Sequence, residues 1–148
     1  TGVQAQALTS SDIFTRPGPV AVIAFSGQHR INKTSAVNAA SHGDGWIILA
    51  HKPDAEGAAA IDRLRSMVNE AGRPNNTVGV DAWVSMGGTT PDDWRSEIEG
   101  WKKLGATHVT LNTAFERQHH RRIEATTVEG HLKAIEQYMS TIADLVSA

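Results

Sequence analysis

The sequence has 148 residues, of which 40% are hydrophobic and 20% charged, and its formal net charge at pH 7 is −2. This composition is typical of one globular domain and excludes a disordered or fibrous chain, while the small net charge supplies no basic field for nucleic acid or anionic lipid. There is no cysteine, which excludes disulfides and thiolate metal sites, and no apolar run is long enough to span a bilayer, so we expect a cytoplasmic protein that binds neither nucleic acid nor membrane.

The first half of the folded part predicts two strands joined by a helix. Residues 1–17 are rich in Ser, Thr and Gln and indicate a linker or long loop, whereas the patterned sequence occupies 18–148. We expect an apolar strand over 20–24, a small-residue helix over about 33–41 and a second strand over 46–50. Both faces of the second strand are apolar, which is typical of parallel sheets.

The middle of the chain carries the sharpest helix boundaries. Asp54 is placed to cap a helix that Gly72-Arg73-Pro74 ends, and a third strand follows over 78–86. Thr90-Pro91-Asp92-Asp93 combines a Thr cap, Pro at the first helical position and acids in the first turn, so it predicts a helix that ends at Gly105. The two helices should bury stripes made of Ile61, Leu64, Met67, Val68 and Ala71, and of Trp94, Ile98, Trp101 and Leu104.

The last strand-helix unit completes a series of four. A strand is expected over 108–111, and Thr126 with Glu129 predicts a capping box for a last helix. The apolar stripe of that helix consists of Leu132, Ile135, Met139, Ile142 and Leu145. Repeated units of this kind build either a doubly wound open sheet or part of a (β/α)₈ barrel. Because a full barrel takes about 250 residues, four units in 148 residues amount to roughly half of one.

Several motifs follow one another in an order that resembles a known family. GDGW at 43–46, AIDRLRSMVNEAGR at 60–73 and GGTTPDDWRSEIEGWKKLGATHVTLNT at 87–113 resemble the C-terminal half of luciferase-like monooxygenases. Within that superfamily they most resemble the oxidoreductases that use the deazaflavin coenzyme F-420. The resemblance implies an α/β fold, a (β/α)₈ TIM barrel of the luciferase-like type, to which residues 18–148 supply the C-terminal half.

A half-barrel needs a partner. The chain begins at Thr1 rather than Met, and we expect either processing or a preceding portion. The partner is then the missing N-terminal half-barrel or a second copy of this chain, in which case the protein is a homo-oligomer.

The same resemblance implies a flavin- or deazaflavin-dependent oxidoreductase or monooxygenase that acts on a small-molecule substrate, with coenzyme F-420 as its cofactor or, alternatively, FMN. The cofactor phosphate is expected at the loop after the first strand, formed by Phe25, Ser26, Gly27, Gln28 and His29. Independently, amides at a helix N-terminus stabilise an anion. The alternative is that Gly27 only permits a tight turn and Ser26 caps the helix.

The ends of the third and fourth strands are the next candidates for binding. Ser85 and Met86 end one strand, and Asn112 and Thr113 end the other, at the level where barrel ligands bind. We expect these residues to line a substrate pocket. Asn112 has both donor and acceptor groups for a substrate or the edge of a flavin ring.

A local basic cluster, ERQHHRR at 116–122, follows the fourth strand. Arg121 and Arg122 are expected to hold a phosphate or the acidic tail of a deazaflavin, and the alternative is a solvated mobile lid. His119 and His120 are adjacent in sequence and lack a third ligand nearby, so we predict no metal site.

The catalytic residues stay unknown at this point. In the family that the sequence resembles, the cofactor carries the hard chemistry, and we expect the proton donors in the other half of the barrel. A second hypothesis is a non-catalytic half-barrel, a structural or interaction module that pairs to close a barrel. A third, an open nucleotide-binding sheet of the flavodoxin type, is disfavoured because no acidic residue stands at the expected position after a glycine-rich turn.

Overall fold

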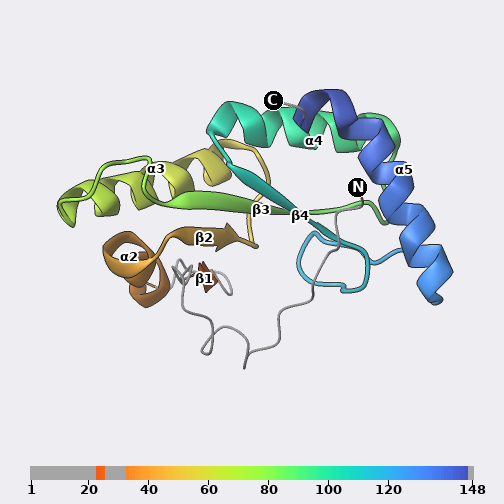
Figure 1. Cartoon of the computed structure of the whole chain (residues 1–148), viewed down its shortest axis with the longest axis horizontal. Coiled ribbons are helices and arrows are strands. Elements are labelled where there is room, and N and C mark those ends of the chain that lie inside the picture. Colours follow the sequence, from red (N-terminus) through yellow and green to blue (C-terminus); the bar gives the residue numbers. More distant parts are fainter. Residues whose placement is uncertain (1–22, 26–32, 147–148) are drawn as a thin grey trace, which may run out of the picture.

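The computed structural model describes residues 23–25 and 33–146, which form parallel strands alternating with helices (Figure 1). The strands are β1 (Ile23–Phe25), β2 (Gly45–Ile48), β3 (Gly79–Ser85) and β4 (His108–Asn112). The helices are α2 (Lys33–His42), α3 (Ala55–Glu70), α4 (Pro91–Leu104) and α5 (Val128–Val146). The α/β class and the order of the elements are thus as predicted. The predicted linker over 1–17 lies outside the described residues.

The sheet adds one strand after another in sequence order, β1-β2-β3-β4. All three neighbouring pairs are parallel; for example, Trp46 of β2 lies opposite Val80 of β3, and Val84 of β3 lies opposite Leu111 of β4. A doubly wound sheet requires a point at which the strand order reverses, and the described strands contain no such point. Right-handed connections between sequential parallel strands place their helices on one face of the sheet.

The core lies between the sheet and the helix layer. Along β3, Val80, Ala82 and Val84 are buried, whereas the alternate residues Asp81 and Trp83 are only partly buried. This period-two pattern separates a face packed on helices from an opposite, more polar face. The predicted stripes of α3 and α4 are confirmed for most of their members. Ile61, Leu64, Val68, Trp94, Ile98 and Trp101 are buried, and Met67 and Leu104 pack against them while partly buried. Ala71 is exposed, because α3 ends one residue before it.

Local capping sets the starts of α3 and α4 as predicted. Asp54 Oδ1 accepts hydrogen bonds from the backbone N–H groups of Glu56 and Gly57, both at 3.0 Å. Thr90 and Asp93 form a reciprocal capping box, in which Thr90 N donates to Asp93 Oδ2 at 2.8 Å. These caps fix where α3 and α4 begin, and so they fix one end of each loop that follows β2 and β3.

The predicted start of the last helix is wrong by one residue. Thr127, not Thr126, supplies the cap: its Oγ1 accepts a hydrogen bond from Gly130 N at 3.2 Å, and α5 begins at Val128. The proposed capping box with Glu129 is therefore absent. Neighbouring threonines offer the same cap chemistry, and the sequence pattern does not distinguish them.

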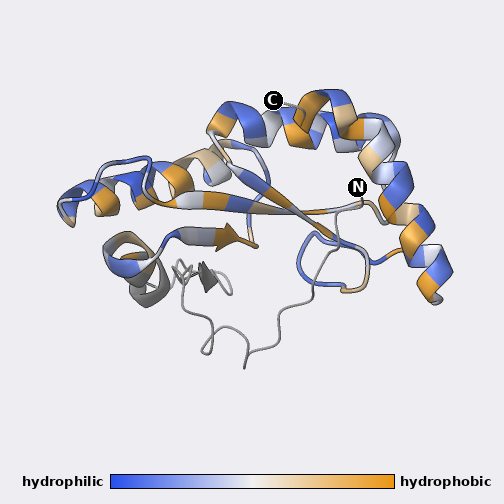
Figure 2. Ribbon diagram, viewed as in Figure 1, coloured by the Kyte–Doolittle hydropathy of each residue, from blue (hydrophilic) through white to orange (hydrophobic). Residues whose placement is uncertain are grey.

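The buried side of α5 also differs from the predicted stripe. Leu132 and Met139 were expected in the core, yet they are 56% and 48% exposed. Ile142 is buried as predicted and Leu145 packs against the core, whereas the other buried residues, Ala134 and Tyr138, were not predicted. Figure 2 shows apolar residues along this outer helix, which lies at the end of the molecule opposite α3.

Candidate functional site

The carboxyl ends of the strands form the candidate site, because parallel strands end at one common edge. The loop over 113–123, here called the edge loop, leaves β4 and lies between β4 and α5 in Figure 1. It contacts the ends of two other strands: His120 Nε2 donates to the carbonyl of Leu49 at 2.8 Å, and Arg121 N donates to Ser85 Oγ at 3.2 Å. The edge loop therefore covers the ends of β2 and β3.

Asn112 organises the start of the edge loop. Its Oδ1 accepts hydrogen bonds from the N–H groups of Ala114 and Phe115 at 3.2 and 3.0 Å, and its Nδ2 donates to the Phe115 carbonyl at 2.8 Å. The side chain is 5% exposed. Three of the four hydrogen bonds that this amide can make are thus used within the loop. These hydrogen bonds hold the start of the edge loop in place, so Asn112 positions the loop.

His120 fastens the middle of the edge loop. The residue is 1% exposed, and its ring meets Trp83 edge-on with centroids 6.0 Å apart. Burial lowers the pKa of His120, against the opposing effect of the Leu49 carbonyl that accepts its N–H. The sequence left open that residues 116–122 form a solvated mobile lid. A buried, neutral imidazole with this hydrogen bond favours a loop that is packed on the sheet.

The residues that were predicted to contact a ligand have different surroundings at this edge. Ser85 lies beside the backbone of Arg121, whose Nη1 donates to the Gln118 carbonyl at 3.1 Å. Thr113 Oγ1 is 2.9 Å from His131 Nδ1. Met86 belongs to the core cluster, and Arg122 is exposed. The structure therefore brings Ser85 and Arg121 together and holds Met86 apart.

The predicted phosphate loop cannot be placed. Ser26, Gly27, Gln28 and His29 lie outside the described residues, and Phe25 is described only through the backbone of β1. Phosphate binding by these residues stays a prediction.

A cavity of about 470 Å³, here called the edge pocket, lies at the ends of β2 and β3. It is bounded by the loop between β2 and α3, the start of α4 and the edge loop. Its lining residues are Lys52, Pro53, Asp54, Ser85, Thr89, Asp93, Ser96, Glu97 and His119. Only Ser85 among these was predicted as a site residue.

Glu97 is the most perturbed acid in the edge pocket. Burial raises the pKa of Glu97 to about 7, although the charge of Lys52 and the nearby indole N–H of Trp101 oppose this shift. The indole N–H does not reach hydrogen-bond geometry. Glu97 lies three residues after Trp94 and four before Trp101, so it shares the helix face of two buried tryptophans, a signal that the sequence already contained.

His119 has the opposite shift. Burial lowers the pKa of His119 to about 4, and the neighbouring His120, Lys52 and His51 add to the effect, against Asp54. Its ring stacks on His120 with centroids 4.0 Å apart. The preceding residue, Gln118, has φ of 57°, a left-handed conformation that is uncommon for a residue other than glycine and marks local strain.

Unpartnered polar atoms gather around these histidines. Among the described residues, the buried atoms without a hydrogen-bond partner include His51 Nδ1, Gln118 Oε1, His119 Nε2 and His120 Nδ1. Buried polar groups normally have partners, so these atoms are candidates for contact with a bound water or ligand. Within the described part, no group of three or more His, Asp or Glu side chains is placed to hold a metal ion.

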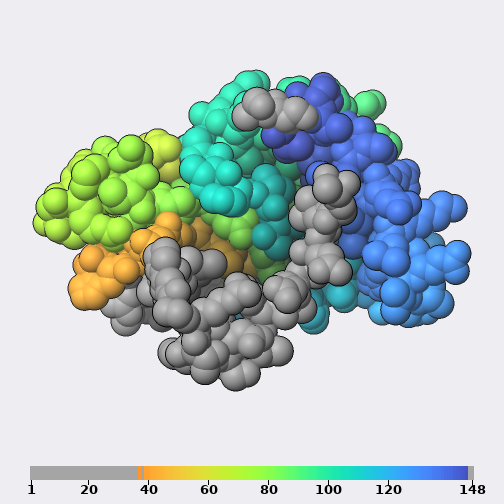
Figure 3. All heavy atoms as spheres, in the orientation of Figure 1, coloured from red at the N-terminus to blue at the C-terminus, as the bar shows by residue number. Residues whose placement is uncertain are grey.

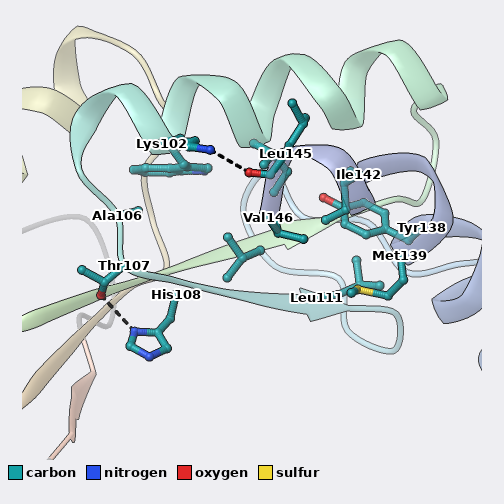
Figure 4. Close-up of a pocket in the computed structure, with 13 residues that line it drawn as sticks. Lys102, Ala106, Thr107, His108, Leu111, Tyr138, Met139, Ile142, Leu145 and Val146 are labelled. Carbon is teal, nitrogen blue, oxygen red and sulfur yellow. Dashed lines mark hydrogen bonds between the residues drawn. The ribbon is translucent and has the colours of Figure 1, made fainter. Parts of the chain in front are cut away.

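A second cavity, of about 370 Å³, is an apolar groove between β4, α4 and α5 (Figure 4). Its apolar walls include Ile98, Leu111, Tyr138, Met139, Ile142 and Leu145. At one end Lys102 Nζ donates to the Leu145 carbonyl at 2.9 Å. Its polar lining residues are Lys102, Thr107, His108 and Tyr138.

Comparisons with known proteins assign no family. No protein-family model matches the sequence, and no curated protein does so either. In the described part of the chain, no helix is both long enough and apolar enough to cross a membrane. The functional conclusions therefore depend on the order of the motifs, the sheet and the edge pocket.

Proposed function

We propose that this chain is the C-terminal half of a luciferase-like (β/α)₈ barrel, and that the complete barrel is a flavin- or deazaflavin-dependent oxidoreductase of the cytoplasm. The observation that carries the proposal is the sequential strand order β1-β2-β3-β4 with parallel pairing throughout. In an eight-stranded barrel each strand pairs with its neighbours in sequence, so this sheet has the order of half a barrel. The motifs at 43–46, 60–73 and 87–113 support the particular family.

The donors at the carboxyl edge fit an anionic cofactor tail. Arg122 is exposed there, and Arg121 uses Nη1 within the edge loop while its other guanidinium nitrogens keep N–H groups for a ligand. Ser85 Oγ accepts from Arg121 N and retains its own proton to donate. When bound, a reduced deazaflavin would supply a hydride, and a reduced flavin would activate oxygen. The arginines would hold the tail, and the edge loop would exclude water.

Cofactor binding tests the proposal. We expect the fluorescence anisotropy of coenzyme F-420, or alternatively of FMN, to rise on addition of the full chain. Arg121→Ala and Arg122→Ala should each weaken binding by about tenfold, since a charge-assisted hydrogen bond contributes about 1.5 kcal/mol or more. Arg63→Ala, on the exposed face of α3, is the control and should change nothing. Failure of the complete barrel to bind either cofactor would reject the enzyme proposal.

A second candidate function is a non-catalytic module that pairs to close a barrel. The observation that favours it is an apolar stripe on α5 whose members are at least 40% exposed: Val128, Leu132, Ile135 and Met139. The partner that we propose is a second copy, because each copy would offer its β1 edge to the β4 edge of the other. Assembly without affinity for either cofactor would support this function, whereas binding of either one would exclude it.

A further inference from the structure

The edge pocket has an inner wall that differs from its rim. At the rim, Lys52, Asp54 and Asp93 are exposed, and both carboxylates are already used to cap helices. Inside, Ser85 is 8% exposed, and Glu97 and His119 are only partly accessible. A volume of about 470 Å³ is in the range of sites that hold small organic molecules. The groups left for a ligand are therefore the inner ones.

The two inner ionisable groups are both most stable without charge. Burial raises the pKa of Glu97 to about 7, so it is a carboxylic acid in mildly acidic solution and can donate a hydrogen bond. Burial lowers the pKa of His119 to about 4, so its imidazole is neutral over the same range. His119 Nε2 is buried and has no partner among the described residues. The inner wall thus combines an unused donor and an unused acceptor.

We propose that the edge pocket binds a small uncharged molecule bearing an amide or hydroxyl group, whose oxygen accepts a hydrogen bond from Glu97 and whose N–H or O–H donates one to His119 Nε2. His119 then carries its own proton on Nδ1. The rim carries charges of both signs, Lys52 against Asp54 and Asp93, so it favours neither an anion nor a cation, and the inner groups decide the ligand class. The proposal goes beyond the cofactor function, because it requires neither a cofactor nor a closed barrel.

The pH dependence follows from the groups around Glu97. Lys52 faces it from the loop before α3, Trp101 from its own helix and Tyr138 from α5, where the Glu97 charge contributes to raising the pKa of the tyrosine. Asp93 and His119 share the pocket. The charge of Lys52 opposes the raised pKa of Glu97 without cancelling it. Glu97 should therefore donate below pH 7 and lose that ability above it.

An isosteric series of probes tests the proposal on the full chain. Benzamide, benzoate and benzamidinium have similar shapes and differ in charge, and binding is followed by amide chemical shifts in two-dimensional NMR. At pH 6 we expect benzamide to shift the signals of Ser85, Glu97 and His119, and to bind at least about fivefold more tightly than either charged probe. At pH 8.5 its affinity should fall by about fivefold, the loss of one hydrogen bond of about 1 kcal/mol.

Two variants distinguish the contribution of the hydrogen bonds to benzamide binding from that of the shape of the pocket. Glu97→Gln keeps a donor at every pH, so it should bind benzamide at pH 6 as the parent does and show no loss at pH 8.5. His119→Phe keeps a ring against His120 but removes Nε2, and it should weaken benzamide at both pH values. The proposal is overturned by equal binding of the three probes, by shifts only outside the pocket, or by a pH dependence that persists in Glu97→Gln.

Discussion

The two ends of the helix layer differ in how completely they are packed. On α3 and α4, Ile61 is 1% exposed and Trp101 is fully buried, whereas Leu132 and Met139 on α5 are 56% and 48% exposed. Figure 3 shows α3 and α5 at opposite ends of the molecule. The helices at both ends carry apolar residues at similar spacing. The difference shows that the spacing of apolar residues defines one face of a helix, but that this face is buried only where a neighbouring element covers it.

α5 differs from α3 and α4 because no described strand follows it in sequence. α3 connects β2 to β3 and α4 connects β3 to β4, so each has a described strand on either side of it in sequence. α5 follows the edge strand β4, where Val109 is 37% exposed. Among the described strands β4 has a partner on one side only, and such an edge beside an apolar groove is a surface at which a further strand could pair.

The largest effect is expected in the packed region. Trp101→Ala should lower the free energy of unfolding by about 3 to 5 kcal/mol, because it removes a fully buried ring that contacts Gly57. Leu132→Ala on α5 should cost less than about 1 kcal/mol in the isolated chain. Urea unfolding of both variants measures the contrast, and equal losses would mean that α5 is already packed.

Glu97 gives the packed region a pH dependence. Its raised pKa means that its stabilising contribution is complete below the unfolded value of 4.5 and is lost as the pH rises through about 7. Glu97→Gln should therefore match the parent at pH 4 and exceed its stability by up to about 3 kcal/mol at pH 8. His119 acts in the opposite direction: its depressed pKa makes acid destabilising as the pH falls from 6.5 toward 4, an effect reduced by its partial exposure. Unfolding curves across pH 4 to 8 measure both, and a parent and Glu97→Gln that stay parallel would exclude the buried acid.

Gly87 connects the packed region to the edge loop. A Cβ at this position would overlap the carbonyl of Arg122, so Gly87→Ala should displace the loop at a cost of about 1 to 3 kcal/mol. Hydrogen exchange should speed up at the amides of His120 and Arg121 and stay unchanged in α3, which is the internal control. Unchanged exchange in the loop would show that it is not held against β3.

The smallest effect is expected between α4 and α5. Arg95 Nη1 and Nη2 donate to the two carboxylate oxygens of Asp144 at 2.6 and 2.7 Å. The hydrogen bond from Arg95 lowers the pKa of Asp144, so its contribution is present above the unfolded value of 3.8 and disappears as the pH falls below it. The ion pair lies at the surface, so it contributes little to stability. The Asp144→Asn variant should have a melting temperature slightly below that of the parent at pH 7 and equal to it in strong acid. A difference that survives at low pH would argue against the ion pair.

Local features were predictable because they depend on neighbouring residues. The caps at Asp54 and Thr90 and the left-handed Gly105 that ends α4, with φ of 82°, follow from residue types within a few positions. Long-range features were not. His120 bonds to Leu49 71 positions away, and Arg73 Nη1 donates to the carbonyls that end α2, including that of Gly43 at 2.9 Å. No periodicity encodes such pairs.

The candidate site was predictable only in its location. Ser85 ends β3 and Arg121 lies beside it at the carboxyl edge, and their binding of a ligand stays a prediction. Glu97 was missed because a charged residue on a helix is normally solvated, and its burial depends on the tryptophans that flank it. Which side of α5 is buried depends on its packing against α4, and the spacing of apolar residues along α5 does not encode that contact.

The central claim is that the β4 edge and the α5 stripe need a second four-stranded sheet, which a second copy supplies when this chain is alone. Its most direct test is the molar mass of the full chain in solution. Light scattering coupled to gel filtration should give twice the mass of one chain, and Leu132→Glu combined with Met139→Glu should return it to the monomer while its helix content is kept. A parent chain that is a folded monomer at every concentration would contradict the claim.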